Sequence, residues 1–328
     1  MHEYMREPVF RSALAPYLHQ FVEEKRVLGC RYTSQARQVG AFDRFLASQG
    51  ATSPDLEKSL ISVWTQKRPH ESHRTHTGRV SLARQIGLFL VRRGFRPYVP
   101  DPRLMPKGRS AFTPYIFTPE QITQLLAAAD QIRPDLRSPH RERVFPLIFR
   151  LLYGCGLRVS EPLHLQVRDV DLAEGLLTIR KSKFQKDRLV PVAPSLTARL
   201  QDYAHTCLSS AAPTTLFFPA PDGGPFCHRV IYDTFRRLLW QCGISYQGPG
   251  RGPRLHDLRH TFAVHRFMQW DREGMDLDVA LPVLAAYLGH VSLSGTQQYL
   301  HLTAQMYPDL SARLEAHYGW VIPGKEQP

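Results

Sequence analysis

Six side chains in the second half of the sequence belong to types that can act together on a phosphodiester. An arginine fork can donate two hydrogen bonds to the non-bridging oxygens of a phosphate, and it keeps its charge at any relevant pH. A tyrosine hydroxyl, whose ordinary pKa is about 10, becomes a nucleophile once a base or a cation activates it. The candidates are Arg158, Lys183, His256, Arg259, His290 and Tyr299.

Each of these types suits a separate part of phosphoryl transfer, which depends on position and on stabilising charge at the equatorial oxygens. Arg158 and Arg259 would hold the phosphate together. His256 lies three residues before Arg259, so the two are neighbours on one helix face, and it is the candidate base. Lys183 would protonate the departing sugar oxygen. Glu161, close after Arg158, would orient that arginine in a supporting role.

Taken one at a time, the same residues have ordinary structural interpretations. Arg158 could neutralise carbonyls at the end of a helix. His256 could be hydrogen-bonded in the core, and His290 could cap a helix. Lys183 lies in a basic run that solvent alone would explain, and Tyr299 could be a buried aromatic. Only the combination of residues favours a catalytic site.

The sequence contexts of the candidates decide between these interpretations. Lys183 and an alternative lysine, Lys186, both precede Arg188-Leu-Val-Pro. The other contexts are Gly156-Leu-Arg-Val-Ser-Glu161, His256-Asp-Leu-Arg259, Leu288-Gly-His290 and Thr296-Gln-Gln-Tyr299. In order and in local context, this series resembles the tyrosine recombinase (phage integrase) family. The resemblance favours Lys183 over Lys186, because its distance to Arg188 fits the family pattern better.

The resemblance implies a reaction and a set of partners. Tyr299 would attack DNA to form a 3′-phosphotyrosyl link and release a 5′-hydroxyl, with no metal and no other cofactor. The partner would be double-stranded DNA carrying a specific recombination site, bound by a homo-tetramer. The segment after Tyr299 would dock either on a neighbouring protomer or on its own domain. The chain could belong to the transposases and integrases of mobile elements.

Two other functions stay open on the sequence alone. A type IB topoisomerase uses the same nicking and resealing chemistry, but it would relax any supercoiled plasmid as a monomer. A catalytically idle DNA-binding accessory factor would keep the fold without the reaction. All six candidate positions are occupied, which disfavours the idle factor. The motif spacing and the C-terminal tail favour a site-specific recombinase over the topoisomerase.

The elements around these residues indicate a mainly α fold with a small antiparallel β-sheet, of the α+β class. Thr118-Pro-Glu-Gln121 predicts a helix that begins at Pro119. An apolar stretch over residues 144–153 ends at Gly154-Cys-Gly156, where glycine allows a left-handed helix terminus. Three β-like runs follow at residues 167–172, 176–179 and 188–192, and helices are predicted for most of the remainder.

The N-terminal third differs in charge from the rest of the chain. The whole chain carries a net charge of +13, and residues 1–110 hold 19 Lys+Arg against 9 Asp+Glu, which indicates a polyanionic partner. Apolar residues recur there at helical spacing. We expect a helical, core-binding (SAM-like) DNA-binding domain over residues 1–95, a Pro-rich linker over 96–118, and a tyrosine-recombinase catalytic domain with a C-terminal tail over 119–328. Basic residues between the apolar positions are the candidate DNA contacts: Arg37, Arg44, Arg74, Arg79 and Arg84.

Other classes of protein are disfavoured by what the sequence lacks. No apolar run approaches the roughly 18 residues that a membrane-spanning helix needs. The first residues do not show the basic and then apolar pattern of a secretion signal. The five cysteines are scattered, and metal-binding or nucleotide-binding motifs are absent. We therefore expect a cytoplasmic, nucleoid-associated protein that binds no membrane.

Overall fold

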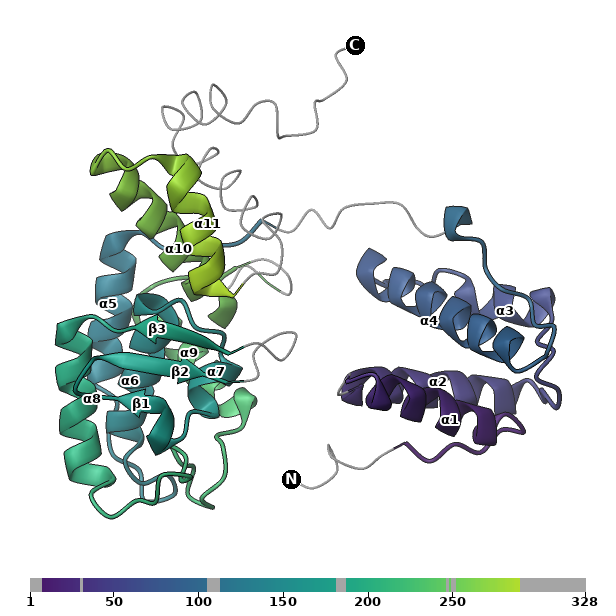
Figure 1. The fold of residues 1–328 in the computed structure, drawn as a ribbon, viewed down its shortest axis with the longest axis horizontal. Helices are drawn as coiled ribbons and strands as arrows, with labels where there is room; N and C mark the ends of the chain where they lie inside the picture. Colours follow the sequence, from purple (N-terminus) through teal and green to yellow (C-terminus); the bar gives the residue numbers. More distant parts are fainter. Residues whose placement is uncertain are drawn as a thin grey trace, which may run out of the picture. The chain divides into compact units, whose positions relative to one another are not determined.

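The chain forms two compact units in the computed structural model, unit 1 over Met1–Ala111 and unit 2 over Phe112–Pro328. The structure describes residues 8–29, 32–104, 113–180, 187–245, 248 and 252–289. Figure 1 shows the elements of both units along the chain. Each unit has its own apolar core and is described separately below.

The described part of unit 1 consists of helices and their connections, as the spacing of its apolar residues predicted. Aromatic side chains fill its core: Phe42 lies 5.0 Å from the Trp64 ring centre, and Phe21 lies 5.5 Å from Phe89. Large aromatic surfaces contribute much of the hydrophobic stabilisation of so small a unit. The helices are α1 (Ala15–Val27), α2 (Thr33–Ser48), α3 (Lys58–Thr65) and α4 (His73–Arg92), followed by a 3₁₀ turn at Pro102–Leu104.

The Pro-rich stretch that we expected to be a linker packs at both of its described ends. The Tyr98 amide donates to the Leu56 carbonyl at 2.7 Å, and Arg84 Nη1 donates to the Pro100 carbonyl, so this end belongs to unit 1. At the other end, Phe117 is fully buried in the core of unit 2. Residues 105–112 between them lie outside the described residues.

Unit 2 begins with the helix predicted from the sequence. The Thr118 side chain accepts from the Gln121 amide and the Gln121 side chain accepts from the Thr118 amide, which confirms both the start of α5 at Pro119 and its capping box. The second predicted helix is also confirmed, since α6 ends at Gly154. The helices of unit 2 are α5 (Pro119–Asp130), α6 (Arg141–Gly154), α7 (Ser160–Leu163), α8 (Pro194–Cys207), α9 (His228–Gln241), α10 (Leu255–Arg272) and α11 (Leu277–Leu288).

A three-stranded antiparallel sheet in the order β1-β2-β3 lies in unit 2 (Figure 1). Leu177 of β2 pairs with Val170 of β1 on one side and with Val190 of β3 on the other. The strands confirm the three predicted runs, although the first run begins as a 3₁₀ turn because Asp169 accepts from the Gln166 amide. The strands are β1 (Val170–Asp171), β2 (Leu176–Ile179) and β3 (Arg188–Pro191), and the turn is η3 (Val167–Asp169).

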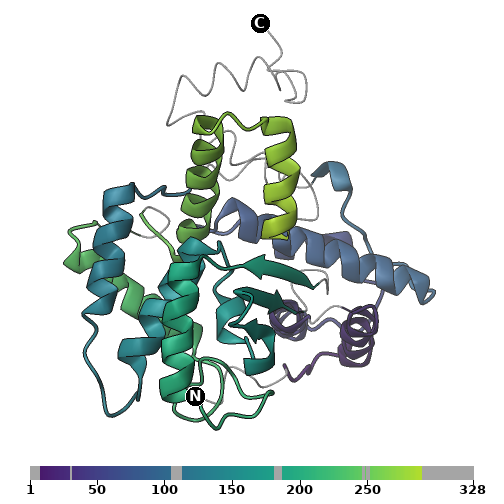
Figure 2. The ribbon, with the colours of Figure 1, turned by 60° about the vertical axis from the view of Figure 1, so that its left-hand side comes forward.

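Two cores fill unit 2. The larger one centres on α6 and α9, where Phe149 and Phe235 are fully buried. The smaller one joins α10 to α11 through Phe262, Leu284 and Leu288, and Figure 2 shows these two helices side by side. Among the described residues, no helix combines the length and the apolar character that crossing a membrane requires.

Candidate active site

The turn after α6 brings Arg158 against α10 and α11. Gly156 has φ +58, a conformation that glycine adopts without strain. A Cβ on Gly156 would lie 2.5 Å from the Phe262 ring of α10 and 3.0 Å from Leu288 of α11. No other residue fits this close approach, so the glycine sets the path of the chain into Arg158.

Glu161, the expected supporting residue, is hydrogen-bonded to Arg158. The Arg158 amide donates to Glu161 Oε2 at 2.8 Å and its Nη1 donates to Oε1 at 2.9 Å. Arg158 Nη2 donates to the Gly289 carbonyl at 3.2 Å. The arginine side chain is 22% exposed and that of Glu161 is 7% exposed, so the carboxylate lies beneath the guanidinium.

Arg259 reaches the same place from α10. Its side chain lies inside the fold, with the residue only 1% exposed. Nη1 donates to the Gly156 carbonyl and Nη2 to the Leu288 carbonyl, both at 2.6 Å. The structure thus brings Arg158 and Arg259 together at the end of α11, although about a hundred residues separate them in sequence.

His256 lies on the first turn of α10, and its ring centre is 4.7 Å from that of His260. Partial desolvation of the ring, and then the positive charge of Arg259, lower the pKa of His256 to about 4. The positive charges of Arg254 and Arg158 act on the His256 pKa in the same direction. A neutral imidazole at pH 7 can accept a proton, as a base must.

The carboxyl group of Glu161 is held ionised by its arginine partners. Burial opposes ionisation, but the hydrogen bonds and charge of Arg188, together with Arg158, outweigh it and keep the pKa of Glu161 below its usual value. Arg188 donates Nη1 to Oε1 at 2.9 Å and Nη2 to Oε2 at 2.8 Å. No role was predicted for Arg188 from the sequence, where its only signal is the Arg188-Leu-Val-Pro context.

Lys183, His290 and Tyr299 lie outside the described residues, as does the alternative Lys186. Lys183 belongs to the connection between β2 and β3, and His290 directly follows Gly289, whose carbonyl accepts from Arg158. Within the described ranges, no three His, Cys, Asp or Glu side chains gather closely enough to hold a metal ion.

In unit 1 the predicted DNA contacts differ in exposure. Arg37 and Arg44 on α2 and Arg74 on α4 are exposed, whereas Arg84 is half-buried beside the Pro100 carbonyl. Arg79 is only 7% exposed. The exposed arginines are therefore available to a partner, whereas Arg79 is buried within unit 1.

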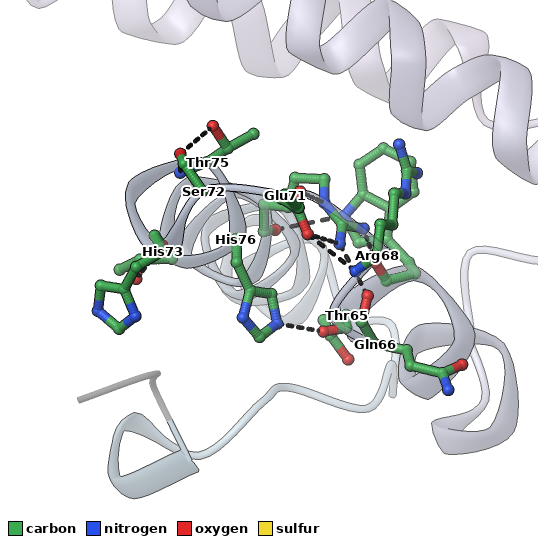
Figure 3. A network of polar contacts seen from close by, with 11 residues as sticks. Thr65, Gln66, Arg68, Glu71, Ser72, His73, Thr75 and His76 are labelled. Atoms are coloured by element: carbon green, nitrogen blue, oxygen red, sulfur yellow. Dashed lines mark hydrogen bonds and ion pairs between the residues drawn. The ribbon is translucent and has the colours of Figure 1, made fainter. Parts of the chain in front are cut away.

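Arg79 closes the connection between α3 and α4. Its Nε and Nη2 donate to the two oxygens of Glu71, each at 2.7 Å, and Nη1 donates to the Trp64 carbonyl. Figure 3 shows Glu71 in this network, with His76 contacting the Thr65 carbonyl beside it. The hydrogen bond from Arg79 lowers the pKa of Glu71 to about 2. We correct the prediction for Arg79: its guanidinium is committed inside unit 1 and is not presented to DNA.

Comparisons with known proteins find a matching family model and related sequences. The model of the phage integrase family matches residues 116–306. A putative integrase/recombinase, y4rB of Sinorhizobium fredii, is 32% identical over 94% of this chain and 98% of its own length. Tyrosine recombinase XerC of Oceanobacillus iheyensis is 29% identical over 89% of this chain and 93% of its own length.

Solved structures share the fold. The Tn1549 transposon integrase in complex with transposon right end DNA covers 92% of this chain and 99% of its own, with a TM-score of 0.62 and 15% identity. A lambda integrase dimer bound to a core site covers 86% of this chain and 94% of its own, with a TM-score of 0.61 and 15% identity. At such identities the likeness concerns the fold alone.

Proposed function

From the premise that this chain belongs to the phage integrase family and is a tyrosine-type, site-specific DNA recombinase, we propose that Tyr299 is its nucleophile. Arg158 and Arg259 bind the non-bridging oxygens of the scissile phosphate. His256 and His290 lie beside them in this proposal, and Lys183 serves the leaving group. The alternatives of a relaxing topoisomerase and an idle accessory factor are not favoured by the family relationship.

The proposed reaction is a pair of transesterifications. The Tyr299 hydroxyl passes its proton to His256 and attacks phosphorus, so that the tyrosyl oxygen–phosphorus bond forms as the bond to the 5′ oxygen breaks. Lys183 gives a proton to that oxygen, which leaves as a 5′-hydroxyl. Attack by a 5′-hydroxyl from another strand then releases Tyr299. The bond energy is kept in the phosphotyrosyl link, so the exchange consumes no high-energy compound.

One observation carries this assignment: two guanidinium groups from distant parts of the chain meet at the end of α11. Arg158 and Arg259 donate to the carbonyls of Gly289 and Leu288, directly before His290. The guanidinium groups of Arg158 and Arg259 can each donate hydrogen bonds to the negatively charged scissile phosphate, and the neutral imidazole of His256 can accept a proton beside them.

Trapping of the covalent intermediate tests the proposal. The full chain is incubated with nicked duplexes cut from the DNA that flanks its coding region, and protein–DNA adducts that resist denaturation are counted. We expect adducts with the wild-type chain and none with Tyr299→Phe, while binding stays intact. Tyr232→Phe is the matched control because Tyr232 lies on α9, outside the proposed catalytic set. An adduct that survives Tyr299→Phe would disprove the assignment.

We extend the proposal to the DNA partner and to assembly. Arg37, Arg44 and Arg74, with a smaller part for Arg84, contact the backbone of double-stranded DNA beside the specific site, in the cytoplasm at the nucleoid. Four protomers act together, joined by the segment after Tyr299. The mass of the protein–DNA complex in solution checks the assembly: a tetramer that is lost when residues 303–328 are removed supports it, and a monomer with the full chain contradicts it.

A further inference from the structure

Arg188 occupies a junction of the candidate active site. It is the first residue of β3, and it pairs with Ile179, the last residue of β2. It therefore stands at the base of the connection that contains Lys183. Its side chain is 9% exposed, so its charge is largely withdrawn from solvent and must be matched by the groups around it.

Those groups come from two other segments. Both outer nitrogens of the Arg188 fork bind Glu161, at 2.9 and 2.8 Å, which is the bidentate geometry that makes Arg–carboxylate pairs strong. The remaining donor, Nε, binds the Tyr287 carbonyl at 3.0 Å. One side chain thus joins β3, the segment of Glu161 and the end of α11.

The end of α11 receives three arginines in a row. The carbonyls of Tyr287, Leu288 and Gly289 accept in turn from Arg188, Arg259 and Arg158. The last carbonyls of a helix lack partners within the helix and carry its partial negative charge, so they attract guanidinium groups. Gly289 itself admits this approach, because a Cβ there would lie 3.2 Å from Cδ of Arg188.

We infer that Arg188 is a positioning residue for strand cleavage: it fixes Glu161, and through Glu161 the guanidinium of Arg158, against the end of α11. This inference rests on the proposed function, since it supposes that Arg158 binds the scissile phosphate. Arg188 itself need not touch DNA, because its three donor nitrogens are directed at Glu161 and Tyr287.

Charge and geometry both enter this role. The charged or titratable groups described around Glu161 are Arg158 before α7, Arg188 on β3 and His256 on α10. Without Arg188, burial would raise the pKa of Glu161, and a protonated Glu161 would no longer hold Arg158. Lysine at this position would keep the charge but could not bind both oxygens and the carbonyl in one plane.

Single-turnover adduct formation tests the inference, on the nicked duplex that gives the wild-type adduct. Arg188→Gln, Arg188→Lys and the control Arg180→Gln are compared at several protein concentrations and from about pH 8 to about pH 5.5. Arg180 is a suitable control because it directly follows β2 of the same sheet but pairs with Asp169 and not with Glu161. The thermal unfolding of each variant is recorded, and rates are taken per folded molecule.

We expect Arg188→Gln to lower the maximal rate of adduct formation about 10²-fold, the loss typical of a misplaced catalytic group. The protein concentration that gives half of the maximal rate should change little. Its rate relative to wild type should fall further as the pH drops. Arg188→Lys should recover part of the rate and show the wild-type pH dependence. Arg180→Gln should be near wild type.

Other outcomes overturn the inference in distinguishable ways. If wild type forms a Tyr299-dependent adduct and Arg188→Gln is as fast per folded molecule, only the role of Arg188 is wrong. The role of Arg188 is also wrong if the loss of rate in Arg188→Gln does not depend on pH and Arg188→Lys recovers none of the rate. If the wild-type chain forms no adduct, the proposed function fails, and the inference fails with it.

Discussion

Both units bury an arginine against a glutamate, but the two sites differ in their balance of charge. In unit 1, Glu71 receives one guanidinium, that of Arg79, and both side chains are under 10% exposed. In unit 2, Glu161 is shared by Arg158 and Arg188, and Arg259 brings a third guanidinium to the same helix end.

The difference separates a structural pair from the proposed phosphate-binding cluster. A one-to-one pair whose remaining donors bind backbone carbonyls is neutral and complete, so it stabilises the α3–α4 connection and offers nothing to a ligand. Three guanidinium groups and one carboxylate at the end of α11 leave an excess of positive charge, and such an excess favours an anion. The same two residue types therefore have different roles in the two units, because one arginine meets one glutamate in unit 1 whereas three arginines and one glutamate gather at the end of α11 in unit 2.

The largest effect on stability should follow removal of the neutral pair. Arg79→Ala leaves the Glu71 carboxylate buried without its partner, which typically costs about 3–5 kcal/mol. Unfolding of the full chain in urea, with hydrogen exchange read on α3 and α4, measures the loss. Arg74→Ala on the same helix is the control, since that side chain is exposed.

Acid adds a second check on this pair. Because the pKa of Glu71 is lowered from 4.5 to about 2, its ionised carboxylate contributes fully to the free energy of unfolding above about pH 4.5. This contribution is lost as the pH falls toward about 2. The stability difference between wild type and Arg79→Ala should narrow over that range. A constant difference would show that Arg79 acts through packing and not through Glu71.

Removal of a guanidinium from the positive cluster should act on the chemistry. Arg259→Ala removes a donor to the transition state, and we expect adduct formation to slow by about 10²–10³-fold. Single-turnover trapping on the nicked duplex measures the rate per folded molecule. Arg229→Ala, at an exposed position on α9, should leave the rate unchanged. A normal rate with Arg259→Ala would refute the proposal that Arg158 and Arg259 bind the scissile phosphate together.

The smallest effects should come from the exposed arginines of unit 1. We expect a modest loss of DNA affinity from each of the variants Arg37→Gln, Arg44→Gln and Arg74→Gln. Each should also reduce the slope of log affinity against log salt concentration by about one, because one fewer counterion is released on binding. Binding measured over a series of salt concentrations gives the slope, and Arg229→Gln is again the control. If none of the three changes the slope, the predicted contacts of unit 1 are wrong.

The sequence predicted most of what depends on local pattern. The capping box at Thr118 and Gln121, the end of α6 at Gly154 and the β2–β3 pair were all legible because each rests on residues a few positions apart. The motif contexts also indicated the family. Arg79 was misjudged because spacing along a helix does not tell whether an arginine faces solvent or a carboxylate from the preceding loop.

The sequence by itself determined which residues have the types for strand transfer, since functional groups and their short-range spacing are written along the chain. Only the tertiary structure decided which charges meet. Arg158, Arg188 and Arg259 converge because the end of α11 presents carbonyls that a helix cannot satisfy internally, and because Gly156 lets α6 approach α10 and α11. That convergence depends on contacts between segments far apart in sequence, and it gives Arg188 a place in the site that its local pattern did not reveal.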